Sequence, residues 1–101
     1  MNVGVSEGMD GTASETVEIV NNRGLHARAS AKFVNMVAML PATLNVAVYK
    51  DGVEAAGGSI LGLMMLGAAK GDTIDIHVSG EGAASALAKI AGLVKDGFGE
   101  D

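Results

Sequence analysis

The clearest fold signal in the chain is the alternating stretch Thr43-Leu44-Asn45-Val46-Ala47-Val48-Tyr49-Lys50. Side chains of a β-strand point to opposite faces with a period of two, so this pattern predicts a strand with one apolar face. That face carries Leu44, Val46 and Val48. Asp51-Gly52 follows directly, and such a pair is typical of tight hairpin turns because glycine accepts positive φ. We therefore expect a second strand to return through residues 53–55.

Hydrophobic spacing and turn residues on both sides predict two more strands and three helices. The strands are expected at residues 16–20 and 73–78, and the helices at residues 25–40, 60–66 and 82–98. Pro41 ends the first helix, and Ser59 is placed to cap the second. The order β-α-β-β-α-β-α predicts an α+β fold, a two-layer open-faced β-sandwich in which three helices cover one face of a four-stranded antiparallel sheet.

The length and composition exclude several classes of protein. A chain of 101 residues is one domain, expected at residues 15–98, with a flexible N-terminal tail at 1–14 and a short C-terminal tail at 99–101. The net charge of −5 disfavours nucleic acid as a partner. The lack of cysteine fits a reducing compartment, and we expect a cytoplasmic protein. No run approaches the roughly 18 apolar residues that cross a bilayer, and the start lacks the features of a signal peptide.

The segment Gly24-Leu25-His26-Ala27-Arg28 places a histidine between a turn and the start of a helix. Unpaired backbone N–H groups and the positive end of the helix dipole favour an anion at such a position. Arg28 adds a guanidinium that can hold two phosphate oxygens, and a neutral imidazole has a free nitrogen lone pair. These residues predict a phosphoryl site, whereas His77, on the outward face of a strand, is expected to be structural.

Three functions remain open from the residues alone. In the first, the chain carries a phosphoryl group on His26. In the second, it is a small hydrolase or phosphatase, but the motif contains no carboxylate to orient the histidine, and Asp75 or Glu54 could approach only through the fold. In the third, it is a regulatory binding module that uses the apolar segment 60–66, and His26 is only a helix cap with Arg28 a surface charge.

Over residues 15–98 the chain resembles the HPr family, the histidine-containing phosphocarriers of the bacterial phosphoenolpyruvate-dependent phosphotransferase system. The segment Gly24-Leu25-His26-Ala27-Arg28-Ala29-Ser30 is similar to the active-site motif of that family. Residues 59–71, which begin Ser59-Ile60-Leu61-Gly62, are similar to its regulatory-serine segment. The family's open-faced β-sandwich also matches the element order that the periodicity predicts.

The resemblance implies that His26 accepts a phosphoryl group on Nδ1 from enzyme I and passes it to an enzyme IIA-type acceptor, while Arg28 stabilises the phosphate. It implies a monomer with no cofactor and no metal. The family most often has proline after the arginine, and Ala29 stands there in this chain, so we expect a less rigid helix start. Ala29-Ser30 is also similar to HPr-like proteins of nitrogen-related phosphotransfer chains, and the sequence leaves the choice between a sugar and a nitrogen branch open.

The resemblance also implies a regulatory role for Ser59, as a site phosphorylated by an HPr kinase/phosphorylase. By itself the residue is an ordinary helix cap worth about 1 kcal/mol. The family's partner-binding surface corresponds to seven positions in this chain, which are Leu25, Ala27, Ala31, Ile60, Leu61, Met64 and Met65. From composition alone, the two methionines would be expected to pack in the core, but they also suit an adaptable binding surface. A phosphate on Ser59 would add about two negative charges beside this surface and weaken docking of an acidic partner.

Overall fold

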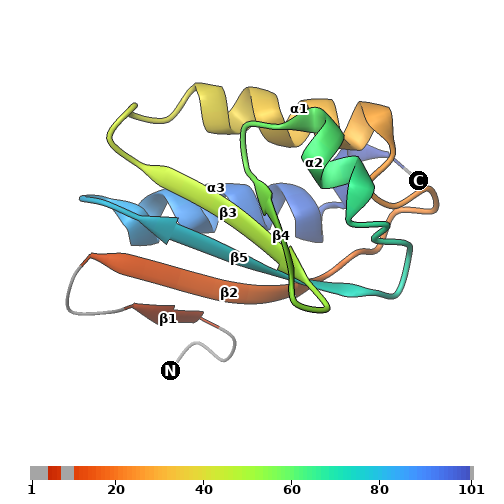
Figure 1. The fold of residues 1–101 in the computed structure, drawn as a ribbon, viewed down its shortest axis with the longest axis horizontal. Coiled ribbons are helices and arrows are strands. Elements are labelled where there is room, and N and C mark those ends of the chain that lie inside the picture. The colour runs from red at the N-terminus through yellow and green to blue at the C-terminus, as the bar shows by residue number, and fades with distance from the viewer. Residues whose placement is uncertain (1–4, 8–10, 101) are drawn as a thin grey trace.

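The computed structural model describes residues 5–7 and 11–100 and has an α+β architecture. Its strands are Val5–Glu7 (β1), Thr12–Glu18 (β2), Asn45–Lys50 (β3), Val53–Ala56 (β4) and Thr73–Ser79 (β5). Its helices are Ala27–Ala38 (α1), Ile60–Met65 (α2) and Ala83–Lys95 (α3), followed by a short 3₁₀ turn at Gly97–Gly99 (η1). All neighbouring strands are antiparallel, in the order β1-β2-β5-β3-β4 (Figure 1).

Strand β5 lies at the centre of the sheet and pairs with both β2 and β3. Its residue Ile76 lies opposite Glu15 of β2 and Val48 of β3. The alternate residues Ile74, Ile76 and Val78 are buried toward the helices, whereas Asp75 and His77 face away from them. Helices α1 and α3 therefore cover one face and leave the other open (Figure 1).

The core is built from aliphatic side chains and two phenylalanines. Phe33 on α1 and Phe98 in η1 are both essentially inaccessible to solvent. Burial of so many small aliphatic groups compensates for the low aromatic content, because each square ångström of apolar surface removed from water contributes about 25 cal/mol. Of the helices in the described part of the chain, none has the length and apolarity to span a membrane.

The four predicted strands and three helices occur in the predicted order, so the predicted fold class is confirmed. The second strand of the sheet nevertheless begins at Thr12, where the sequence predicted a tail up to residue 14, and β1 adds a fifth strand beside it. The hydrophobic pattern did not predict this start of the strand, because a glutamate, Glu15, occupies a position that faces the core. Its carboxylate is buried and forms an ion pair with Lys95 of α3. The rest of the predicted tail, residues 1–4 and 8–10, lies outside the described residues.

The C-terminal part of the chain also differs from the prediction. Helix α3 ends at Lys95 instead of about Phe98, since Gly97 takes a left-handed conformation with φ +65° that stops the helix. The turn η1 follows and buries Phe98. Glu100, predicted in a free tail, lies against the start of α1, whereas Asp101 is outside the described residues.

Candidate functional site

The turn 21–25 places His26 at the N-terminal end of α1. Gly24 has φ +62°, and a Cβ added to it would lie 2.3 Å from the carbonyl oxygen of Ala68. The same carbonyl accepts a hydrogen bond of 3.0 Å from the Leu25 N–H. A glycine is therefore required for the chain to pass this close to the segment after α2. The next residue, His26, has extended backbone dihedrals and is the N-cap of α1.

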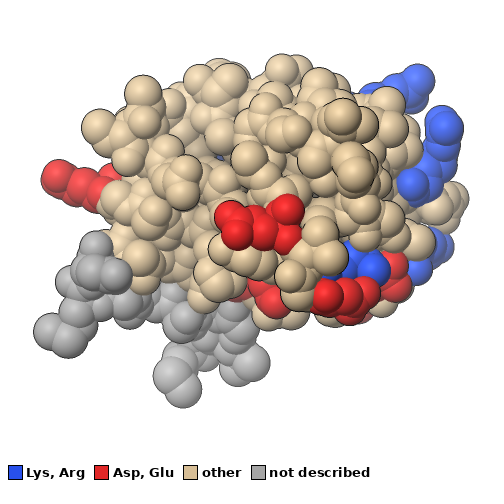
Figure 2. Space-filling model, viewed as in Figure 1, with Lys and Arg blue, Asp and Glu red and all other residues tan. Residues whose placement is uncertain are grey.

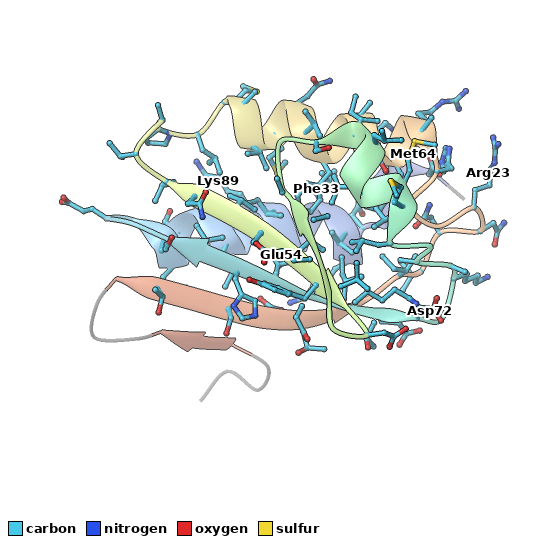
Figure 3. All side chains as sticks on the ribbon, viewed as in Figure 1. Arg23, Phe33, Glu54, Met64, Asp72 and Lys89 are labelled. Atoms are coloured by element: carbon cyan, nitrogen blue, oxygen red, sulfur yellow. The ribbon has the colours of Figure 1, made fainter. Side chains whose placement is uncertain are left out.

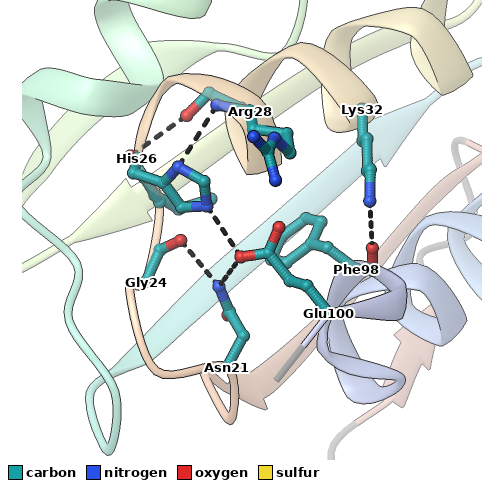
Figure 4. A network of polar contacts seen from close by, with 9 residues as sticks. Asn21, Gly24, His26, Arg28, Lys32, Phe98 and Glu100 are labelled. Carbon is teal, nitrogen blue, oxygen red and sulfur yellow. Dashed lines mark hydrogen bonds and ion pairs between the residues drawn. The ribbon is translucent and has the colours of Figure 1, made fainter.

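The hydrogen bonds of His26 identify its tautomer. Its Nδ1 accepts from the backbone N–H of Arg28 at 3.3 Å. Its Nε2 lies 2.7 Å from Oε1 of Glu100 (Figure 4). A backbone N–H can only donate, so Nδ1 carries the lone pair and Nε2 carries the proton. The nitrogen with the free electron pair thus faces the exposed amides at the helix start.

Glu100 is held by two donors on one oxygen. Asn21 is 1% exposed, and its side-chain amide donates to Oε1 of Glu100 at 3.0 Å and to the Gly24 carbonyl at 2.9 Å. The hydrogen bond from His26 is the largest influence on the Glu100 carboxyl and lowers its pKa. The Asn21 amide and the nearby charge of Lys32 also lower this pKa, whereas burial of the carboxyl raises it. The carboxylate therefore stays ionised beside the imidazole.

Cationic side chains gather around this site although the chain as a whole is acidic. A shallow cavity of about 200 Å³ is lined by Asn22, Arg23, His26, Arg28 and Glu100. Figure 2 shows lysine and arginine side chains at the right-hand end of the molecule, and Figure 3 places Arg23 there. With exposed guanidinium groups and the positive end of α1 at its rim, the cavity suits a small anion such as a phosphoryl group.

An exposed apolar patch lies on α2, made of Ile60, Leu61, Met64 and Met65 with exposed fractions of 40%, 67%, 40% and 74%. Helix α2 packs against α1, and Met64 lies at the same end of the molecule as Arg23 (Figure 3). On α1, Ala27 is exposed and Ala31 half-buried. Leu25, predicted with this surface, is instead part of the core at 4% exposed, so it anchors the turn and offers no side chain to a partner. Ser59 caps α2 as predicted, accepting from the Gly62 N–H at 2.9 Å.

The other candidate residues lie away from His26. His77 is exposed on the open face of the sheet, with its ring 4.7 Å from that of Tyr49. Asp75 accepts a hydrogen bond of 2.6 Å from Thr16 on the same face, and Glu54 interacts with Tyr49. Neither carboxylate is the partner of His26. The fold supplies that partner from Glu100 instead.

Sequence reasoning missed three residues of the site. The sequence alone assigns no functional role to Asn21 or Arg23 and places Glu100 in a C-terminal tail. Glu100 lies 74 residues from His26 in the chain, and no spacing pattern connects positions so far apart. Asn21 carried a usable signal, because an asparagine that begins a turn before a functional residue can bond the turn's own backbone.

Comparison with known proteins identifies related sequences over most of the chain. The family model described as "PTS HPr component phosphorylation site" matches residues 13–96. The phosphocarrier protein HPr of Neisseria meningitidis serogroup A is 41% identical over 86 residues, which cover 85% of this chain and 94% of that protein. The phosphocarrier protein NPr of Escherichia coli K12 is 36% identical, over 89% of this chain and 99% of that protein. The crystal structure of HPr from Thermoanaerobacter tengcongensis superposes with a TM-score of 0.80 at 32% identity, covering 87% and 97% of the two chains.

Proposed function

Because the chain belongs to the HPr family of phosphotransferase-system phosphocarriers, we propose that it carries its phosphoryl group on Nδ1 of His26. One observation carries this assignment: Nδ1 is the unprotonated ring nitrogen and lies at the N-terminal end of α1. The other histidine, His77, lies on the open face of the sheet and has no comparable surroundings.

The transfer step needs no proton movement within this chain. The lone pair of Nδ1 forms the new N–P bond while the bond between phosphorus and the donor nitrogen breaks, and the donor keeps that electron pair. Before transfer, the backbone N–H of Arg28 donates a hydrogen bond to Nδ1. Once Nδ1 is bonded to phosphorus, this N–H can donate to a phosphate oxygen instead. The guanidinium of Arg28 can bind further oxygens, and the helix dipole favours the added negative charge. The reverse step passes the group to an acceptor.

We assign the donor to a phosphorylated enzyme I and the acceptor to an enzyme IIA-type protein, as family membership implies. The exposed apolar patch on α2 lies next to α1 and supports a docking role, because exposed methionines adapt to different partners. The cations around His26 would attract acidic partner surfaces and favour rapid encounter. We further propose that a single copy of the chain carries out the transfer and that the relay operates in the cytoplasm.

Ser59 is the proposed regulatory position. Its hydroxyl lies at the start of α2, beside the exposed side chains of Ile60 and Leu61. A phosphate there would put a dianion at the edge of the docking patch and oppose an acidic partner. If the serine acts only as a helix cap, a negative charge at position 59 should weaken partner binding less.

Phosphorylation with a defined donor tests the main proposal. The protein is incubated with phosphoenolpyruvate and enzyme I, and the expected product is an acid-labile, base-stable phosphate. His26→Ala should abolish the label, and the matched variant His77→Ala should retain it. A chain that binds partners with His26 as a simple cap would stay unlabelled, and a phosphatase would release inorganic phosphate without enzyme IIA. Labelling that survives His26→Ala would refute the assignment.

A further inference from the structure

We infer that Arg23 is a second phosphoryl-binding residue, whose guanidinium binds oxygens of the group on His26 together with the guanidinium of Arg28. The inference rests on the phosphocarrier function proposed above and adds a residue that lies outside α1. Arg23 is on the turn before the histidine, and it lines the same cavity.

The turn that carries Arg23 is held by three hydrogen bonds. The Gly24 N–H donates to the Asn21 carbonyl at 3.2 Å and closes residues 21–24 into a turn. The buried side chain of Asn21 donates to the Gly24 carbonyl at 2.9 Å. The side chain of Asn22 accepts a hydrogen bond of 3.0 Å from the ammonium group of Lys70. Arg23 therefore projects from a fixed backbone, so binding of a ligand by its guanidinium orders little of the turn.

The guanidinium of Arg23 is available to a ligand. Other cations already donate to a carbonyl or to a side chain, and these are Lys32, Lys50, Lys70 and Lys95. No hydrogen bond or ion pair among residues 5–7 and 11–100 engages the guanidinium of Arg23 or of Arg28. Both side chains are exposed and line the cavity of about 200 Å³ beside His26, and Arg23 extends outward at that end of the molecule (Figure 3). Two free guanidinium groups thus share one cavity with the proposed acceptor.

The charge within this cavity gives the second guanidinium its role. A phosphoryl group brings about two negative charges, and the carboxylate of Glu100 lines the same cavity. Against this negative charge stand the guanidinium of Arg28, the positive charge that the ring gains when Nδ1 bonds to phosphorus, and about half a charge from the helix N-terminus. The guanidinium of Arg23 offsets the remaining excess. Charge in the transition state is spread over three oxygens of the phosphoryl group, so two planar groups of donors can bind more of them than one.

One variant and one matched control test this role in the full chain. Arg23→Ala removes the guanidinium from an exposed position. Lys89→Ala removes the same charge from an exposed side chain that lines a separate cavity of about 240 Å³. Urea midpoints should equal that of the original chain in both variants, because neither side chain is buried, and they report whether each variant stays folded.

The first readout is the binding of inorganic phosphate to the unphosphorylated chain, followed by NMR of the His26 ring and the Arg28 N–H. Ionic strength is held constant, so that general screening does not change during the titration. Arg23→Ala should weaken the affinity by about fivefold, between the small effect of an exposed ion pair and the larger effect of a charge-assisted hydrogen bond. Lys89→Ala should leave the affinity unchanged. Equal affinities in the two variants, or no binding by the original chain, would overturn the inference.

The second readout is single-turnover transfer from phosphorylated enzyme I at increasing concentrations of the chain. A residue that binds the phosphoryl group in the transition state contributes to the maximal rate, whereas one that contacts only the partner protein contributes to the half-saturating concentration. Arg23→Ala should lower the maximal rate by about fivefold relative to Lys89→Ala. A change in the half-saturating concentration alone would assign Arg23 to the partner surface and overturn the inference, with the phosphocarrier function left standing. Absence of labelling of the original chain would instead refute the proposed function, and the phosphate affinities would still decide whether Arg23 binds the anion.

Discussion

Replacing Gly24 by alanine perturbs the turn that carries His26, and the structure allows its cost to be worked out against a matched control. Gly24 has φ +62°, and its new Cβ would lie 2.3 Å from the Ala68 carbonyl oxygen and 2.9 Å from the Ala69 Cα. Gly52, in the hairpin between β3 and β4, has φ +81° and nothing within 4 Å of the same added atom. Both variants therefore force alanine into the left-handed region, but only Gly24→Ala also forces one backbone segment away from another.

The left-handed conformation costs an alanine about 1–2 kcal/mol relative to glycine in both variants. At Gly24 the displaced segment adds an overpacking cost of about 1–3 kcal/mol. It also weakens the hydrogen bond of 3.0 Å from the Leu25 N–H to the Ala68 carbonyl, worth about 0.5–1.5 kcal/mol. Gly24→Ala should therefore lower the free energy of unfolding by about 2–4 kcal/mol more than Gly52→Ala.

Urea denaturation measures this difference directly, provided that the slope m is the same in both variants. We also expect Gly24→Ala to reduce phosphoryl transfer, since the turn places the histidine at the start of α1, whereas Gly52→Ala should leave transfer unchanged. Equal losses of stability in the two variants would show that the close approach to Ala68 does not constrain the turn, and the reasoning would be refuted.

Three further predictions concern separate parts of the chain. Arg28→Ala should leave the urea midpoint unchanged, because its side chain is exposed, but should slow phosphoryl transfer by about tenfold or more through loss of a charge-assisted hydrogen bond; an unchanged rate would contradict its assigned role. Ser59→Ala should lower stability by about 1 kcal/mol through loss of the helix cap, and Ser59→Asp should weaken enzyme I binding at low salt, an effect that calorimetry would find absent if the serine were only a cap. Burial raises the pKa of Tyr49, and the negative charge and the hydrogen bond of Glu54 raise it further. The neutral phenol therefore stabilises the fold fully below the ordinary tyrosine pKa of about 10, and this stabilisation is lost as the pH rises through the raised pKa. Urea midpoints followed above about pH 10 should fall less steeply in Glu54→Gln, and equal slopes would disprove the link.

The sheet and helices were predictable wherever hydrophobic spacing and turn residues agreed. Strand β3 and its hairpin are an example, since alternation from residue 45 to 50 and the Asp51-Gly52 turn indicate the same structure. The start of β2 was not predictable in this way. There a glutamate faces inward, and only a lysine on the last helix, Lys95, makes that position acceptable. Local patterns cannot show a charge pair whose two members lie 80 positions apart.

The same division holds for the candidate site. His26 and Arg28 could be identified because their chemistry lies within one helix start, where dipole, backbone amides and side chains act over a few residues. Glu100 could not, because its position depends on the left-handed turn at Phe98 and on the packing of that ring. Leu25 was misassigned for a related reason, since an apolar residue in a turn can serve either a partner or the core, and only the fold distinguishes them.

The distance in sequence between the histidine and its carboxylate has a consequence for biosynthesis. A ribosome makes His26 some 74 residues before Glu100, and a domain generally folds as a unit. A nascent or truncated chain that stops before Gly97 would contain His26 without the carboxylate that its Nε2 contacts. Assembly of the candidate site is thereby tied to completion of translation, and a label fused directly after α3 would replace the segment that brings Glu100 to His26.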